Sequence, residues 1–175
     1  MNHPVAVDDI RAALDRAVEA YFGEDQKRIA HARRVTDFAL QLLPREGGDY
    51  AIVVGAAMLH DIGIFLAERK YGSTSGAYQE KEGPPIARRI LGELGFSATQ
   101  LDEICQIIAH HHSPGKVQTR NFSIVYDADW LVNLRDEYDI RKSKKLTSII
   151  DRVFLTESGK AKAREEYLTK ANHDV

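Results

Sequence analysis

His60 and Asp61 stand side by side at the end of an apolar segment, residues 51–59. Imidazole and carboxylate groups both ligate divalent metal ions and both exchange protons, so the pair can serve in either role. Two adjacent ionisable groups beside core residues need compensation for lost hydration, and a metal ion would supply it. The alternative is a polar helix end, in which Asp61 turns back to the backbone and Gly63 stops the helix.

Two further polar residues point into the predicted core. Apolar residues follow His31 at i+4, i+7 and i+11, which places the imidazole on the apolar face of a helix. Asp129 has valines at i−4 and i+3 in another apolar helical stretch, so it also faces inward. Asp127 is rotated about 200° away from Asp129 on a regular helix. We therefore expect Asp127 to lie behind the site and orient a ligand histidine or a basic residue.

These inward groups come from three separate predicted helices, and unpaired they would cost several kcal/mol. Clustering around one cation removes that cost, so the sequence predicts a metal site formed by His31, His60, Asp61 and Asp129. Two imidazoles and two carboxylates suit manganese, iron, cobalt, nickel or zinc better than magnesium or calcium. We expect one divalent transition metal ion, whose identity the ligand set leaves open.

The order of these residues resembles the HD superfamily of metal-dependent phosphohydrolases: a His, a His-Asp pair about 30 residues later, and an Asp in an Ala-Asp-x-Leu setting. The resemblance covers residues from about 25 to 135. It implies a hydrolase that cleaves a small phosphate ester or a nucleotide with a water activated by the metal. Coordination lowers the pKa of water from 15.7 towards about 7, which makes it a nucleophile near neutral pH.

Three successive histidines, His110, His111 and His112, close an amphipathic helix. They spread around most of a turn and cannot all face one point. In many HD enzymes a His follows an Ile by three residues here, which makes His110 the first choice and His111 the second. Either would contact phosphate, act as an acid or bind a second metal, whereas His112 is expected in solvent.

Relatives with two metals usually carry another histidine where this chain has Gln79. An amide is a poor ligand for these metals, although Glu80 or Glu82 could substitute. The resemblance therefore favours one metal ion over two.

Arg34 and Lys81 are the basic residues expected to bind substrate, because an arginine fork or an ammonium group suits phosphate oxygens. Arg88 and Lys116 are weaker candidates of the same kind. The alternative for each is an ordinary solvated surface charge.

A net charge of −2 gives no overall attraction to nucleic acid or to acidic membranes. The single cysteine, Cys105, excludes an internal disulfide and favours a reducing compartment; flanking isoleucines suggest that it is a small buried hydrophobe. The first residues hold no apolar stretch of signal-peptide type, and residues 51–59 are too short to span a bilayer. We therefore expect a cytoplasmic protein with no membrane partner.

Apolar spacing is helical along nearly the whole chain. It predicts a single all-α domain over residues 1–175, a bundle of about seven or eight helices, with the core motifs in 25–135 and C-terminal helices in 139–170. The expected helices are about 7–21, 24–43, 49–60, 82–94, 98–112, 122–135, 139–156 and 158–170. Glycine and serine in Phe65–Glu82 predict a loop, either a lid or an ordinary connection.

Two other functions are compatible with these motifs. A di-iron oxygenase of the same superfamily would need a six-ligand site with two metals, and Gln79 argues against it. A degenerate, non-enzymatic HD module for binding or signalling would lack ligands, and all four are present. Metal content, together with a screen of phosphate esters and nucleotides, separates these possibilities.

Overall fold

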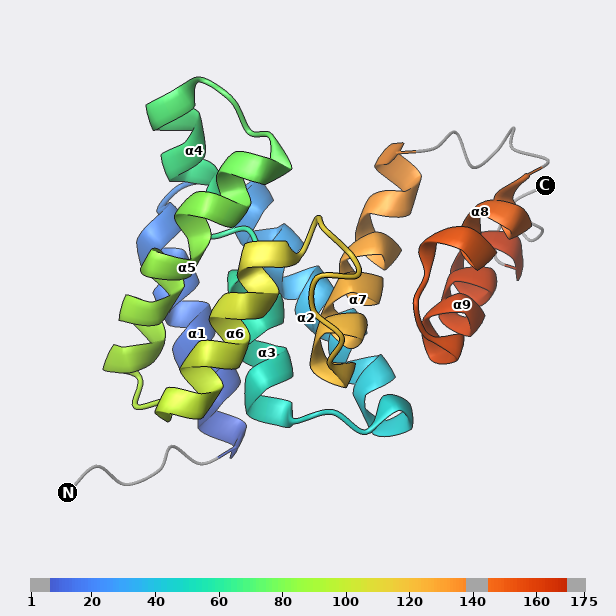
Figure 1. The fold of residues 1–175 in the computed structure, drawn as a ribbon, viewed down its shortest axis with the longest axis horizontal. Helices are drawn as coiled ribbons and strands as arrows, with labels where there is room; N and C mark the ends of the chain where they lie inside the picture. The colour runs from blue at the N-terminus through green and yellow to red at the C-terminus, as the bar shows by residue number, and fades with distance from the viewer. Residues whose placement is uncertain (1–6, 138–144, 170–175) are drawn as a thin grey trace.

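Helices form all the regular structure in the residues that the computed structural model describes, 7–137 and 145–169, which confirms the all-α prediction. Figure 1 shows the helices packed side by side, with α8 and α9 lying beyond α7. The elements are α1 (Val7–Phe22), α2 (Gln26–Glu46), α3 (Tyr50–Leu59), α4 (Ile64–Tyr71), α5 (Gly76–Glu93), α6 (Ala98–His110), α7 (Arg120–Glu137), α8 (Leu146–Val153), α9 (Glu157–Arg164) and a π-helical turn, η1 (Glu165–Thr169).

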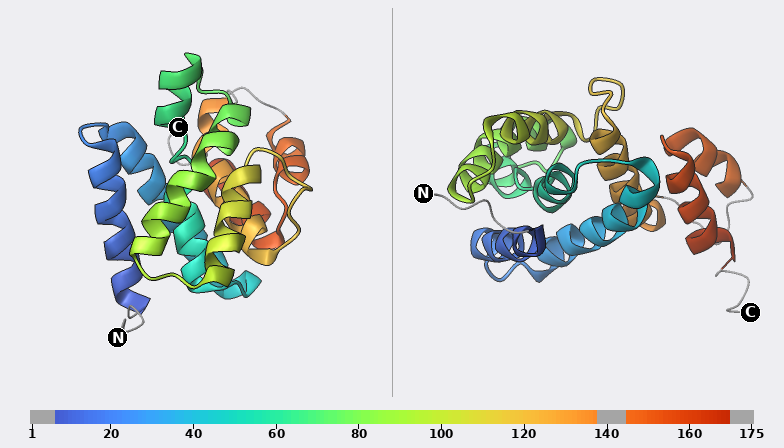
Figure 2. Two further views of the ribbon diagram at one scale, coloured as in Figure 1. Left: turned by 60° about the vertical axis from the view of Figure 1, so that its left-hand side comes forward. Right: turned by 90° about the horizontal axis from the view of Figure 1, so that it is seen from below.

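Helix α3 is the central element, and its residues 52–59 are all buried. It packs against α1, α2, α6 and α7, which cover it from different sides. Figure 2, seen from below, shows α3 between the α1–α2 pair and the α5–α6 pair. The Asp49 side chain accepts a hydrogen bond from the Ile52 N–H at 2.9 Å and starts the helix. A helix buried on every side explains why the sequence there lacks a polar face.

By length and composition, the segment Tyr50–Tyr71 could cross a membrane. This segment is longer than residues 51–59, which the sequence analysis considered, because it includes α4, which follows α3 after one turn. However, 67% of its most apolar window is buried inside the protein. A buried core helix of a soluble protein also meets these criteria of length and composition, so the segment is weak evidence for a membrane span.

The loop predicted over Phe65–Glu82 is wrong, because α4 and α5 occupy most of it. Gly72, at φ 62°, ends α4 in the left-handed conformation, and α5 begins four residues later. The Glu82 carboxylate ties the two helices together by accepting from Lys70 Nζ at 2.8 Å and from the Tyr71 hydroxyl at 2.7 Å. These contacts, with burial, outweigh the low helix propensity of the glycines.

Helix α5 begins at Gly76, so the predicted start at residue 82 is also wrong; Pro84 and Pro85 lie inside the helix. At the C-terminus, the structure gives a shorter α8 than the predicted 139–156, and residues 138–144 lie outside the described part. Helix α9 packs on α7 and α2, and the Tyr167 hydroxyl of η1 donates to the Leu131 carbonyl of α7. The extent of the domain over 1–175 stays a prediction.

Candidate metal centre

Four side chains from α2, the end of α3 and α7 converge at one point. His31 Nε2 lies 3.2 Å from His60 Nε2 and 3.2 Å from Asp129 Oδ1. Asp61 Oδ2 lies 3.5 Å from His31 Nε2 and 3.4 Å from His60 Nε2. His60 is fully buried, and Asp129 is 8% exposed. The structure thus brings together the four residues that the sequence predicted as ligands.

The backbone sets the orientation of His60. It follows the last residue of α3, and its Nδ1 lies 2.8 Å from the Ala57 carbonyl oxygen. A carbonyl only accepts, so Nδ1 carries a proton and Nε2 presents a lone pair in the neutral ring. That lone pair faces two carboxylates and another imidazole. Acceptor atoms at this spacing require a proton or a metal cation between them.

The electrostatics of these side chains agree with this requirement. Burial lowers the pKa of His60, but the charges of Asp61 and Asp129 raise it more, and the net pKa lies well above the ordinary value. Burial raises the pKa of Asp129, but the charge of His60 and hydrogen bonds from the two histidines lower it by more. The net pKa of Asp129 lies well below its usual range. The carboxylates therefore stay ionised, and the cluster attracts positive charge.

The spacing of the donor atoms also fits a transition metal. With bonds of about 2.1 Å, neighbouring ligands lie about 3.0 Å apart in an octahedral site and about 3.4 Å apart in a tetrahedral one. The histidine–histidine and histidine–carboxylate separations within the cluster run from 3.2 to 3.5 Å. Even without Asp61, the side chains of His31, His60 and Asp129 form a group that could hold an ion.

A second group adjoins the first through Asp61. Its Oδ1 lies 3.3 Å from His111 Nε2, and His112 completes a set of three that could also hold an ion. His111 repeats the geometry of His60: it follows the last residue of α6, and its Nδ1 lies 2.7 Å from the Ile108 carbonyl oxygen. Asp61 therefore connects the two groups with its two carboxylate oxygens.

The comparison with protein families bears directly on this cluster. The model of the HD domain matches residues 28–134, more than half of the chain and the part that holds all four converging residues. The chain belongs to the HD domain family. Among curated proteins, none is significantly similar to it.

The HD fold is also found in a solved relative. A crystal structure described as a predicted HD superfamily hydrolase, from an uncultured Thermotogales bacterium, superposes with a TM-score of 0.63 at 24% identity. The match covers 95% of this chain and 87% of the other. At this identity the likeness establishes the fold.

Within this HD domain, His111 rather than His110 lies beside Asp61. His110 is the last residue of α6, is half-buried and belongs to neither metal-binding group among the described residues. The order of preference predicted from the sequence is therefore reversed in the geometry. Helical periodicity could not show this, because the turn after α6 directs His111 inward. His112 is exposed as expected, although it is a member of the second group.

The two glutamates suggested as replacement ligands have other partners. Glu80 accepts from the His112 N–H at 3.0 Å and from the Ser113 hydroxyl at 3.1 Å, and so holds the end of α6. Glu82 binds Lys70 and Tyr71, which lie on α4. Gln79 is buried; its Nε2 donates to the Thr74 carbonyl at 2.7 Å, and its Oε1 has no hydrogen-bond partner among the described residues.

Asp127 is fully buried, but its hydrogen bonds run away from the HD ligands. Its carboxylate accepts from the Leu155 N–H at 2.8 Å, the Thr156 N–H at 2.8 Å and the Thr156 hydroxyl at 2.6 Å. Burial raises the pKa of Asp127 to about 6, against the lowering effect of these hydrogen bonds. None of these hydrogen bonds joins Asp127 to a ligand histidine or to a basic residue, which is the contact that we expected from the sequence. The carboxylate instead attaches the α8–α9 turn to α7.

The basic residues predicted to bind substrate lie outside both groups. Arg34 is exposed one helical turn after His31, and exposed Lys81 lies with its Nζ 5.3 Å from the centre of the Tyr71 ring. Both residues therefore stay predictions as phosphate contacts.

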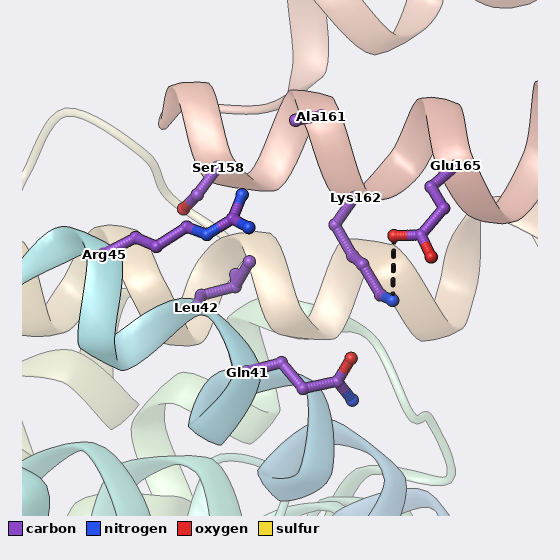
Figure 3. A pocket seen from close by; sticks show the side chains of 7 residues that line it. All are labelled: Gln41, Leu42, Arg45, Ser158, Ala161, Lys162 and Glu165. Atoms are coloured by element: carbon purple, nitrogen blue, oxygen red, sulfur yellow. Dashed lines mark hydrogen bonds and ion pairs between the residues drawn. The ribbon is translucent and has the colours of Figure 1, made fainter.

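A pocket of about 170 Å³ lies between α2 and α9, away from the HD ligands (Figure 3). It is lined by Gln41, Leu42, Arg45, Ser158, Ala161, Lys162 and Glu165. Its polar groups are largely paired within the protein, since Lys162 Nζ binds Glu165 and Glu166, and Ser158 donates to Glu46. It contains no cluster of metal-binding side chains among the described residues.

Proposed function

We propose that this HD domain is a metal-dependent phosphohydrolase that cleaves a small phosphate ester, with nucleotides as the first class to test. The observation that carries the proposal is the convergence of acceptor atoms from His31, His60, Asp61 and Asp129 at separations that suit one cation. The family supports a metal site of this type.

Each residue has a distinct part in the proposed reaction. The four converging residues hold the ion; when bound, it would generate a nucleophile from water near neutral pH and neutralise charge on the phosphoryl group. His111 lies beside Asp61 with Nδ1 fixed on a carbonyl, so its Nε2 can accept, hold or donate a proton at the edge of the site. Arg34 and Lys81 are proposed to meet the substrate's phosphate oxygens.

The test combines metal analysis with an activity screen. The protein is purified without chelator, its metal content is measured, and phosphate monoesters and nucleotides are assayed with manganese, iron, cobalt, nickel and zinc. His60→Ala and Asp61→Ala should lower metal occupancy and abolish hydrolysis while helix content by circular dichroism stays near wild type. Asp102→Ala, at an exposed carboxylate of α6, serves as the matched control.

The alternatives give different results in the same experiment. Normal metal content in both variants would refute the site. Stable metal binding without turnover of any ester would favour the non-enzymatic module. Two iron ions per chain together with consumption of dioxygen would favour the oxygenase.

A further inference from the structure

Asn133 lies one helical turn beyond Asp129 on α7 and contacts its carboxylate. The Asn133 Nδ2 donates a hydrogen bond of 2.8 Å to Asp129 Oδ1. Residues four apart on a helix lie on the same face, and α7 is helical throughout this stretch. Such a pair on a helix surface can be an ordinary local contact. Which carboxylate oxygen accepts the hydrogen bond decides whether the contact also affects the metal centre.

The accepting oxygen is the one that faces the metal centre. Asp129 Oδ1 lies 3.2 Å from His31 Nε2 and 3.5 Å from His60 Nε2. The torsion that rotates an Asp carboxylate is broad and has no sharp minimum of its own. A donor fixed on the same helix restricts that rotation and keeps Oδ1 directed at the two histidines.

We propose that Asn133 is a positioning residue of the metal centre: its amide N–H holds the Asp129 carboxylate in the orientation that binds the ion. A neutral amide can do this without adding charge and without competing for the metal. Asn133 is only partly buried, so its replacement removes little core packing. Loss of an outer partner of this type typically weakens metal affinity about 10–100-fold.

The chain offers a matched control on the same helix. Asn121 also uses its amide in structural hydrogen bonds: its Oδ1 accepts from the Asp49 N–H, and its Nδ2 donates to Glu103. It contacts none of the four proposed ligands in these bonds. Its replacement should destabilise the fold and leave the metal centre unchanged.

The experiment titrates Co²⁺ and Mn²⁺ into full-length wild type, Asn133→Leu, Asn133→Ala and Asn121→Ala. We expect both Asn133 variants to bind about 10–100-fold more weakly and to change the visible spectrum of bound Co²⁺, while their metal-free unfolding midpoints stay near wild type. Asn121→Ala should show a lower midpoint with wild-type affinity and spectrum.

Wild-type affinity and spectrum in Asn133→Leu would overturn the proposal. An equal loss of affinity in Asn121→Ala would also overturn it, because general destabilisation would then explain the effect. The inference rests on the metal centre and not on hydrolysis. A protein that binds metal but cleaves no ester would refute the proposed function and leave this result intact.

Discussion

At the scale of single residues, the site depends on histidines that end helices. His60 and His111 both follow the last helical residue, and both hold Nδ1 against the carbonyl three residues earlier. Each Nε2 then projects beyond the helix end towards Asp61. A bound Nδ1 fixes both the tautomer and the ring orientation of a metal-ligating or proton-exchanging histidine.

We predict that His111→Ala reduces activity more than His110→Ala. His111 Nε2 lies 3.3 Å from Asp61 Oδ1, whereas His110 belongs to neither metal-binding group. Removal of a group that exchanges protons in the reaction typically costs about 10²–10⁴-fold in rate. Steady-state kinetics on the best substrate of the screen measure both variants, with circular dichroism as the folding control. A greater loss of activity in His110→Ala would contradict the prediction and show that His110, not His111, acts at the site.

We also predict that Asp129→Asn loses metal and activity, whereas Asp127→Asn mainly loses stability. Asp129 faces the two histidines; Asp127 accepts three hydrogen bonds from the α8–α9 turn, and an amide cannot accept all of them. Unsatisfied buried donors cost about 1–3 kcal/mol each. Metal analysis and urea unfolding at pH 7 distinguish the two effects. Retained metal and turnover in Asp129→Asn, with neither in Asp127→Asn, would reverse the assignment.

At the scale of elements, a close backbone crossing positions the His-Asp turn against α5. A Cβ built on Gly63 would lie 2.5 Å from the Gln79 carbonyl oxygen and 2.6 Å from the Gly83 nitrogen. The φ of Gly63 is −75°, so the glycine is required for space and not for a left-handed conformation. The turn after Asp61 therefore touches the backbone of α5 directly.

We predict that Gly63→Ala destabilises the protein by about 3 kcal/mol or more, because a clash with backbone atoms cannot be relieved by a rotamer change. Gly92→Ala is the matched control. It lies in α5 with no atom within 4 Å of a new Cβ, so alanine should be neutral or stabilise by up to about 1 kcal/mol. Urea unfolding of both variants measures the difference. Equal stabilities would show that the crossing is looser than described.

At the scale of the whole molecule, metal binding should stabilise the fold, because one ion would bind acceptor atoms contributed by three helices. At a free ion concentration 100 times Kd, linkage predicts about 2.7 kcal/mol. For a chain of this size that corresponds to about 5–11 °C in Tm. Thermal scans by circular dichroism with and without Mn²⁺ measure it, and Asp129→Asn should lose the shift. An unchanged wild-type Tm would contradict a shared metal site.

We further expect one tightly bound ion per chain. The second group, Asp61, His111 and His112, shares its carboxylate with the first site, and Gln79 supplies an amide where binuclear relatives carry a histidine. Titration calorimetry with Mn²⁺ or Co²⁺ gives the stoichiometry. Two ions bound with similar affinity would show that the second group is sufficient, and would reopen the oxygenase hypothesis.

The sequence by itself determined the all-α class and the four converging residues. Both follow from local rules: apolar spacing of 3.6 residues defines which side of a helix is buried, and His31 and Asp129 fall on that side. A polar residue on a buried face must find a partner, which is why the cluster could be predicted before any contact was known. The family match covers residues 28–134, the range that holds all four of them.

Only the tertiary structure decided how helix ends and outer partners are arranged. The turn after α6 selected His111 over His110, and docking of the α8–α9 turn gave Asp127 partners that no local pattern contains. The predicted loop became α4 and the start of α5 because contacts from Glu82 and a glycine crossing stabilise residues of low helix propensity. Such features depend on long-range packing and on turn geometry, and periodicity carries information about neither.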